Sequence, residues 1–153
     1  MKNTRLFSAL ALALTFACAA PAFGAEAPAT SQEQVYKLIA TLKSEAPQKD
    51  KADACRQLGL IGNKDAVPAL AALLGDEQLS HMARYALETI PDPAVDEALR
   101  AALTQLHGKP LIGVITSVGV RHDAMATTQL TSFLYSTDPG IEWAAASALG
   151  FIG

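Results

Sequence analysis

Cysteine is scarce in this sequence of 153 residues, which has only Cys18 and Cys55. Cys18 lies in an N-terminal segment that we expect to be removed, so Cys55 would remain alone. A single cysteine cannot form an internal disulfide, and it excludes both a CxxCH haem-attachment motif and a cysteine-rich zinc site. The fold must therefore be held together by packing.

Clusters of basic residues are also absent. The chain has 12 Lys and Arg against 15 Asp and Glu, a formal net charge of −3. Loss of Lys2 and Arg5 with the N-terminal segment would lower this charge to −5. A mildly acidic protein without a basic patch is a poor candidate for binding nucleic acid or an anionic membrane. We expect neither partner.

Long apolar runs are missing outside the first two dozen residues, so we expect no membrane helix in the mature chain. Residues 1–24 have the layout of a secretory signal peptide. Two basic residues precede an uncharged stretch at 6–20, which is too short to cross a bilayer comfortably. Ala22 and Gly24 place small residues at the −3 and −1 positions, which predicts cleavage after Gly24.

Export follows from this prediction. The mature protein would begin with a short linker at 25–30 and would be periplasmic or extracellular. The alternative is a lipoprotein anchored through Cys18. Residues 15–18 form a poor lipobox, because Leu14 lies one place too early.

What the sequence does contain is a repeat. Four segments align on an apolar anchor, and the anchors are 29, 31 and 31 residues apart. The anchors are Leu58, Leu87, Val118 and Leu149. Each has a small or β-branched residue four positions earlier, and three have isoleucine three positions later. These positions share one face of an α-helix, which predicts a buried stripe in every copy. Arg121 interrupts the stripe of the third copy, where we expect Val120 to take the buried position.

A second apolar helix follows each of the first three copies. Asp65, Asp92 and Asp123 open these helices, and aspartate is a good N-cap because its carboxylate accepts from free backbone N–H groups. Ser31 and Gln34 open one more amphipathic helix before the repeats. A pair of helices every ~30 residues, each unable to bury its stripe alone, is the unit of an α-solenoid.

The motif itself points to a family. Leu-Gly-Leu-Ile-Gly at 58–62, followed by Asp-Ala-Val-Pro-Ala-Leu at 65–70, resembles short bacterial HEAT repeats, including those of the phycobilisome-lyase-like type. The resemblance covers roughly residues 50–153. It implies the architecture, but this family serves many unrelated binding tasks, so it does not imply one function.

We therefore predict an all-α fold, an α-solenoid of stacked antiparallel helix hairpins. An N-terminal amphipathic helix at 31–49 would precede HEAT-like repeats at 50–153. These repeats would comprise three hairpins and the first helix of a fourth. No second helix would then cover Leu149 and Ile152, so we expect an incomplete array or self-association through the C-terminal helix.

Candidate catalytic residues do not form a recognisable constellation. His81 is expected to begin a helix, His107 to end one as a C-terminal cap partner, and His122 to lie in a turn. No His-Glu dipeptide, phosphate-binding loop or nucleophile elbow is present. Ser117 and Ser147 lie inside repeat helices, where packing explains them. We expect no catalytic residue, no metal site and no cofactor.

Two further residues need an interpretation. Cys55 falls on the buried side of its helix, which favours a small apolar residue over a reactive thiol. Trp143 lies six positions before its anchor and off the buried stripe. Exposed aromatic residues often mark contact sites, so Trp143 is the candidate surface contact, with packing against a neighbouring repeat as the alternative.

The sequence thus favours a non-enzymatic, protein-binding scaffold of the periplasm or cell exterior. Its partner would lie along a concave surface formed by the non-core positions of residues 66–75, 94–106 and 126–136. The alternative is an accessory repeat domain of a longer exported enzyme, whose catalytic part lies outside this chain. A lyase-like enzyme would need a bound pigment, and no residue specifically supports one.

Overall fold

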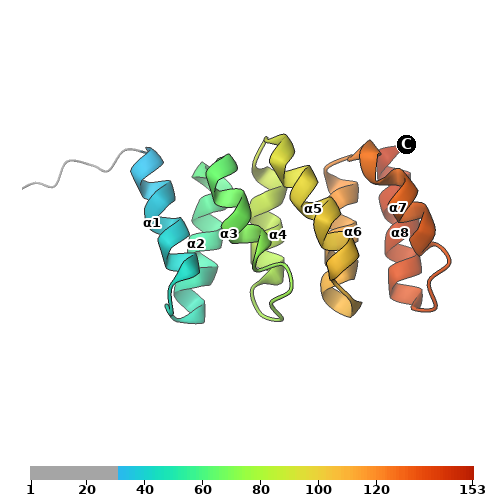
Figure 1. Cartoon of the computed structure of the whole chain (residues 1–153), viewed down its shortest axis with the longest axis horizontal. Helices are drawn as coiled ribbons and strands as arrows, with labels where there is room; N and C mark the ends of the chain where they lie inside the picture. The colour runs from blue at the N-terminus through green and yellow to red at the C-terminus, as the bar shows by residue number, and fades with distance from the viewer. Residues whose placement is uncertain (1–30) are drawn as a thin grey trace, which may run out of the picture.

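The computed structural model describes residues 31–153, and this part of the chain is a stack of helices (Figure 1). The predicted signal peptide, the linker at 25–30 and Cys18 lie outside the described residues. No β-strand occurs between residues 31 and 153, and the predicted all-α solenoid is confirmed. The helices are α1 (Ser31–Lys43), α2 (Gln48–Ile61), α3 (Val67–Ala71), α4 (Ser80–Thr89), α5 (Pro93–Gln105), α6 (Gly108–Val120), α7 (Thr127–Phe133) and α8 (Pro139–Ile152), with 3₁₀ turns η1 (Lys64–Ala66) before α3 and η2 (Ala124–Ala126) before α7.

The helices form two layers. Helices α2, α4, α6 and α8 pack side by side in one layer, and α1, α3, α5 and α7 form the other, as the alternation along the long axis of Figure 1 shows. Each even-numbered helix packs on the odd-numbered helix before it, so the hairpins are α1–α2, α3–α4, α5–α6 and α7–α8. Across 31–153, no helix is both long and apolar enough to cross a bilayer.

This pairing corrects the predicted phase of the repeat. The helix at 31–49 was expected to precede the array, but α1 is the first member of the first hairpin and α2 begins at Gln48. The helix that was expected to be an uncovered first member, α8, is instead the second member of the fourth hairpin and packs on α7. The predicted stripes were correct, but the neighbour assigned to each stripe was not.

The anchor positions explain why the even-numbered layer forms. The side chains of Leu58, Leu87 and Val118 are completely buried, and the residues four positions before the anchors are equally buried. Leu149 is only partly buried, because α8 has no later helix of the described chain beside it. Burial of a leucine side chain stabilises a fold by about 1.5–3 kcal/mol, so each fully buried anchor contributes substantially to stability.

Small residues allow the even-numbered helices to approach closely. Gly59 of α2 faces Ala86 of α4, and a Cβ added to Gly59 would lie 3.4 Å from the Ala86 Cα. Gly119 of α6 faces Ala148 of α8 in the same register, and there the added Cβ would lie only 2.7 Å from the Ala148 Cα. In both pairs, the residue after one anchor meets the residue before the next anchor.

The contact between α4 and α6 departs from this rule and is looser than its two neighbours. Glu88 and Ser117 occupy the positions that glycine and alanine occupy elsewhere, and the Ser117 hydroxyl donates a hydrogen bond of 2.6 Å to the Glu88 carboxylate. Two larger polar side chains hold the helices further apart than a glycine–alanine contact would. The middle of the solenoid is therefore joined by polar contacts.

Candidate functional site

The predicted contact residue, Trp143, lies near the start of α8. Asp138 caps this helix by accepting a 2.8 Å hydrogen bond from the Gly140 N–H, and Pro139 occupies the first turn, where its missing N–H costs nothing. These features fix the position of the first turn. The Trp143 side chain is 74% exposed, so the alternative of packing against a neighbouring repeat is not what the structure shows.

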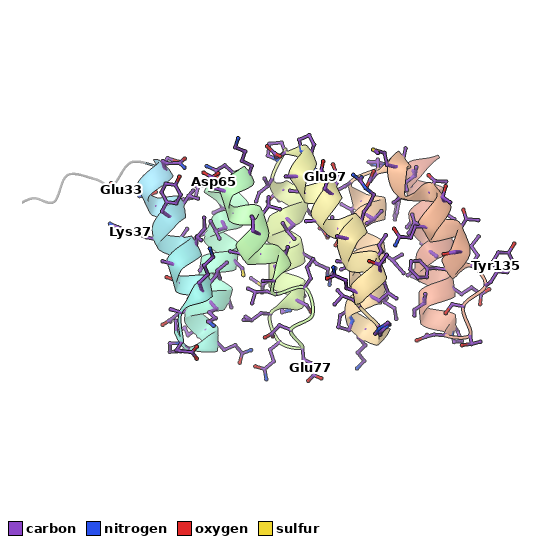
Figure 2. The ribbon with its side chains drawn as sticks, viewed as in Figure 1. Glu33, Lys37, Asp65, Glu77, Glu97 and Tyr135 are labelled. Carbon is purple, nitrogen blue, oxygen red and sulfur yellow. The ribbon has the colours of Figure 1, made fainter. Side chains whose placement is uncertain are left out.

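A shallow depression of about 520 Å³ surrounds this tryptophan. The residues that line it, here called the C-terminal aromatic surface, come from α8 and the end of the α7 segment. They are Leu134, Pro139, Glu142, Trp143 and Ala146. Tyr135 follows Leu134 in the chain, is 86% exposed and projects outward at this end of the stack (Figure 2).

The two ends of the described solenoid differ in charge. The exposed positions of α1 include Glu33, Lys37 and Lys43, and Figure 2 shows the first two at the N-terminal end of the stack. By contrast, Asp138 and Glu142 are the only charged residues from 124 to 153. The C-terminal aromatic surface is apolar apart from the Glu142 carboxylate, a composition typical of a contact site.

The three histidines lie at separate places in the fold. His81 is the second residue of α4, as expected for the start of a helix. His107 was expected to cap the end of a helix, but it is the N-cap residue of α6 and makes no capping hydrogen bond there. His122 lies in the turn after α6 with a φ of 54°, and its Nδ1 is at hydrogen-bond distance from the Phe151 carbonyl. Within residues 31–153, no three His, Cys, Asp or Glu side chains converge on a point where a metal could bind.

Cys55 is buried, as predicted. Burial removes water from the thiol and disfavours the thiolate, which raises the pKa of Cys55 to about 11. A thiol in this state is a weak nucleophile at neutral pH. Cys55 therefore contributes packing to the core.

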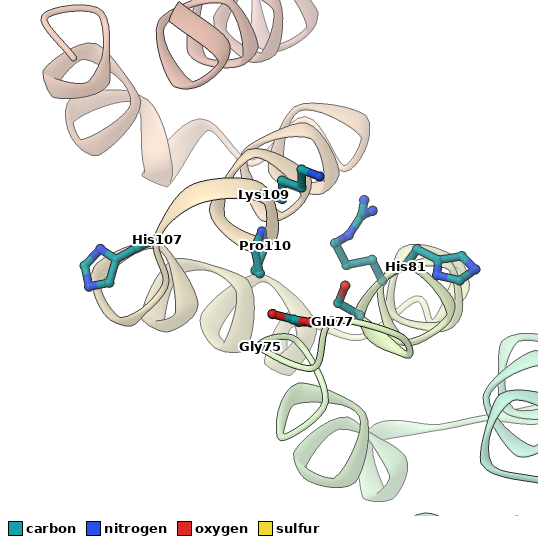
Figure 3. A pocket seen from close by; sticks show the side chains of 8 residues that line it. Gly75, Glu77, His81, His107, Lys109 and Pro110 are labelled. Atoms are coloured by element: carbon teal, nitrogen blue, oxygen red, sulfur yellow. The ribbon is translucent and has the colours of Figure 1, made fainter. Parts of the chain in front are cut away.

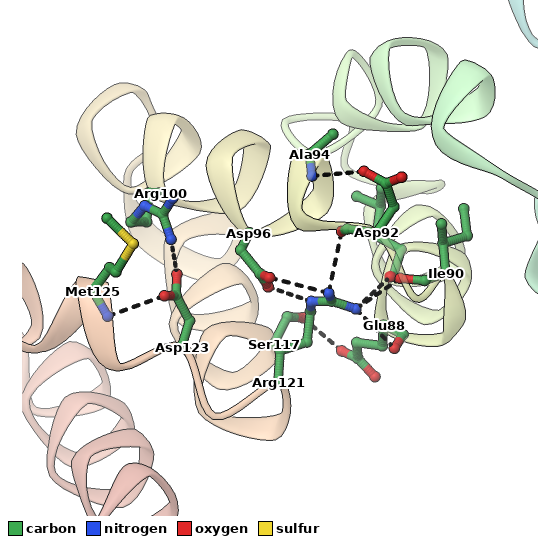
Figure 4. Close-up of polar contacts among 11 residues, drawn as sticks. Glu88, Ile90, Asp92, Ala94, Asp96, Arg100, Ser117, Arg121, Asp123 and Met125 are labelled. Atoms are coloured by element: carbon green, nitrogen blue, oxygen red, sulfur yellow. Dashed lines mark hydrogen bonds and ion pairs between the residues drawn. The ribbon is translucent and has the colours of Figure 1, made fainter.

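Arg121 has a role that the sequence analysis missed. Its side chain is only 12% exposed, whereas Val120, the residue expected to be buried, is 47% exposed. The guanidinium donates to the carbonyl oxygens of Leu87 and Ile90 at the end of α4, at 3.3 and 3.0 Å. The Leu87 carbonyl also accepts from the Ile90 N–H, and the Ile90 carbonyl from the Asp92 N–H. Arg121 therefore supplies a second donor to the end of α4 from a neighbouring repeat (Figure 4).

The same guanidinium joins three elements. It forms a salt bridge with Asp96 of α5, and it also donates to the carbonyls of Glu88 and Asp92. A second pair, Arg100 of α5 with the buried Asp123, lies beside it in Figure 4. We call the group around Arg121 the α4–α5–α6 clasp. It contains no nucleophile and no unpaired acid or base, so its chemistry is structural.

Ser117 and Ser147, which packing was expected to explain, differ in surroundings. Ser117 is completely buried, and besides its bond to Glu88 it lies 3.4 Å from the Arg84 Nη1 donor. Ser147 is only partly buried, on α8. For Ser117 the packing interpretation was incomplete, because it belongs to a polar contact between α4 and α6.

The segments expected to form a concave binding surface make up the other layer. Residues 66–75, 94–106 and 126–136 contain α3, α5 and α7, whereas Trp143 belongs to the layer of even-numbered helices. The predicted surface and the predicted contact residue therefore lie on different layers. Trp143 is exposed beside an apolar depression, and it is therefore the stronger candidate for a contact site.

Comparison with known families agrees with the geometry. The HEAT-repeat family matches residues 35–111, which is half of the chain and contains α2 to α5 entire. No curated protein matches the sequence. The helix hairpins, the buried stripes and this match lead to one assignment. The chain belongs to the HEAT-repeat family.

Proposed function

We propose that this protein is a non-enzymatic scaffold that binds another protein through the C-terminal aromatic surface. HEAT repeats are commonly protein-interaction scaffolds. The observation that carries the proposal is the 74% exposure of Trp143 in an apolar depression at the end of the stack. Tryptophan and tyrosine dominate the energetics of protein interfaces because they bury a large apolar area with few rotatable bonds.

The proposed place of action is the periplasm or the cell exterior. Support for this comes from the sequence of residues 1–24, whose basic start, uncharged stretch and Ala22-x-Gly24 site are typical of a signal peptide. N-terminal sequencing of the protein recovered from the periplasm of a Gram-negative host is the direct measurement. We expect a chain that begins at Ala25. A chain that retains Met1 would contradict export, and lipid on Cys18 would establish the lipoprotein alternative.

Photo-crosslinking tests the proposed surface. A benzoylphenylalanine placed at Trp143 should give a discrete crosslinked species in the cells that make the protein. The same probe at Tyr36 is a matched control, because Tyr36 is an aromatic residue that is 54% exposed at the opposite end of the solenoid. We expect a product from position 143 and none from position 36. Equal crosslinking from both positions would contradict a localised surface.

The size of the crosslinked species identifies the kind of partner. A product heavier than the chain by an unrelated mass indicates a different protein. A product of twice the chain mass indicates a second copy, which would support self-association through the C-terminal helix. Sedimentation of the Trp143→Ala variant then decides between them, because only a self-associating protein would become smaller.

A further inference from the structure

The loose contact between α4 and α6 opens into a pocket at the N-terminal ends of these two helices. Its volume is about 760 Å³, within the range of ligand pockets in proteins. Arg84 contributes from α4, Lys109 from the first turn of α6 and Glu77 from the loop before α4 (Figure 3). His81 and His107 lie on opposite sides, and in Figure 3 their rings point away from the middle of the pocket.

The two cations that line this pocket have no acidic partner. Each of the other three arginines between residues 31 and 153 forms a salt bridge. No carboxylate of the described chain lies within salt-bridge distance of Arg84 or Lys109, including that of Glu77 on the same pocket wall. Two unpaired cations against one carboxylate leave the pocket with an excess of positive charge in a protein whose net charge is negative.

Arg84 is held in place by α6. Its Nη1 donates to the Gly113 carbonyl at 3.2 Å and contacts the Ser117 hydroxyl, so its position is set before any ligand arrives. A Cβ added to Gly113 would lie 2.6 Å from the Arg84 Nε, so glycine leaves the room that the guanidinium occupies. This Nε is buried and has no hydrogen-bond acceptor within the described residues. Because this Nε is closed to solvent, the donors left for an anion are those of Nη2, which makes no hydrogen bond within the described residues.

The start of α6 adds further positive potential. The helix runs for 13 residues, its first turn has no acidic residue, and no side chain caps its free N–H groups. Gly108 has a φ of 56°, a conformation that glycine adopts without strain. The backbone donors and the positive end of the helix dipole therefore favour an anion on the same side as Lys109.

We propose that the α4–α6 pocket binds an oxyanion, a carboxylate or phosphate group, between Arg84 and Lys109. This inference is independent of the C-terminal aromatic surface, which lies in the fourth hairpin. The oxyanion has two sources with the same chemistry, the acidic side chains of a bound peptide and a free small anion. The experiment separates the two by its choice of probe.

The test is calorimetric titration of the protein, at low ionic strength and in a buffer without anions of this kind, with inorganic phosphate and with hexaglutamate. Binding of phosphate alone indicates a site for a small free anion, and tighter binding of hexaglutamate indicates an acidic peptide. We expect Lys109→Met to weaken binding by roughly three- to tenfold. Arg84→Met should weaken it by at least about tenfold.

Lys49→Met is the matched control, because Lys49 is the exposed second residue of α2 as Lys109 is of α6. This control should bind both probes like the unmodified protein. If Arg84→Met unfolds the protein, Lys109→Met still tests the proposal, because that side chain is exposed. No heat of binding for either probe, or equal weakening by Lys49→Met and Lys109→Met, would overturn it.

Discussion

Removal of the Arg121 guanidinium should destabilise the protein far more than removal of an exposed arginine. Arg121→Met keeps much of the apolar stem but leaves the Asp96 carboxylate without its partner and removes one donor from each of four carbonyl oxygens. The two side chains are 12% and 25% exposed, so water replaces these bonds only in part. Breaking a buried pair by removing one partner costs about 3–5 kcal/mol. Allowing for the exposed part of Asp96, we expect a loss of about 2–4 kcal/mol.

The measurement is the free energy of unfolding from urea titrations followed by far-UV circular dichroism. Arg56→Met is the matched control, since Arg56 pairs with Asp53 on the surface of α2 with exposures of 62% and 40%. Exposed pairs of this kind contribute at most about 0.5 kcal/mol.

The comparison of the two variants tests the reasoning directly. If Arg121→Met costs no more than Arg56→Met, the clasp does not stabilise the fold. A cycle with Asp96→Asn separates the ion pair from the carbonyl contacts. The double variant should cost less than the sum of the single variants by about 1–2 kcal/mol, because Asp96 without Arg121 has already lost its partner.

Three further comparisons test the packing and the buried thiol. Leu87→Ala should lower the free energy of unfolding by about 3–4 kcal/mol, and Leu149→Ala by less than half of that, because Leu87 is fully buried and Leu149 only partly. Urea titrations measure both values. Gly119→Ala should lower the melting midpoint, since the new Cβ would lie 2.7 Å from an α8 backbone atom, whereas Gly150→Ala, with nothing within 4 Å, should raise stability by up to about 1 kcal/mol. Burial raises the pKa of Cys55 from 9.0 to about 11, so the unfolded chain loses the thiol proton at lower pH than the folded protein does. The free energy of unfolding should therefore fall as the pH rises from 9.0 to about 11, and this fall should be smaller in Cys55→Ala.

The sequence predicted the stripes because helical periodicity records which face of a helix is buried. It did not record which neighbour covers that face, and this is why the phase of the hairpins was wrong. The α2 and α3 segments are joined by the short connection Gly62–Asn63 and η1, whereas residues 72–79 separate α3 from α4. The stripe of α2 was predicted to pair with the helix that follows it, but α3 packs on α4 across the longer connection. Packing contacts, and not loop length, define the unit.

Arg121 shows a different limit of the sequence. Its position three residues after the anchor carries isoleucine in the other copies, so the arginine looked like an interruption of the stripe. In the structure it keeps the buried position and exchanges apolar contact for hydrogen bonds to a helix end and to Asp96, 25 residues earlier. Periodicity cannot reveal such a partner, because the distance along the chain differs from the repeat length.

The register of the anchors, once the structure is known, explains why the pocket lies between α4 and α6. Elsewhere in the even-numbered layer, a glycine after one anchor meets an alanine before the next, and the backbones touch. At α4–α6 these positions hold Glu88 and Ser117, which form a hydrogen bond and keep the helices apart. Gly113 then lies where it makes room for Arg84 instead of for a helix backbone. The same exchange of small residues for polar ones that loosens the stack thus creates the space of the pocket, and Arg84 and Lys109 supply its positive charge.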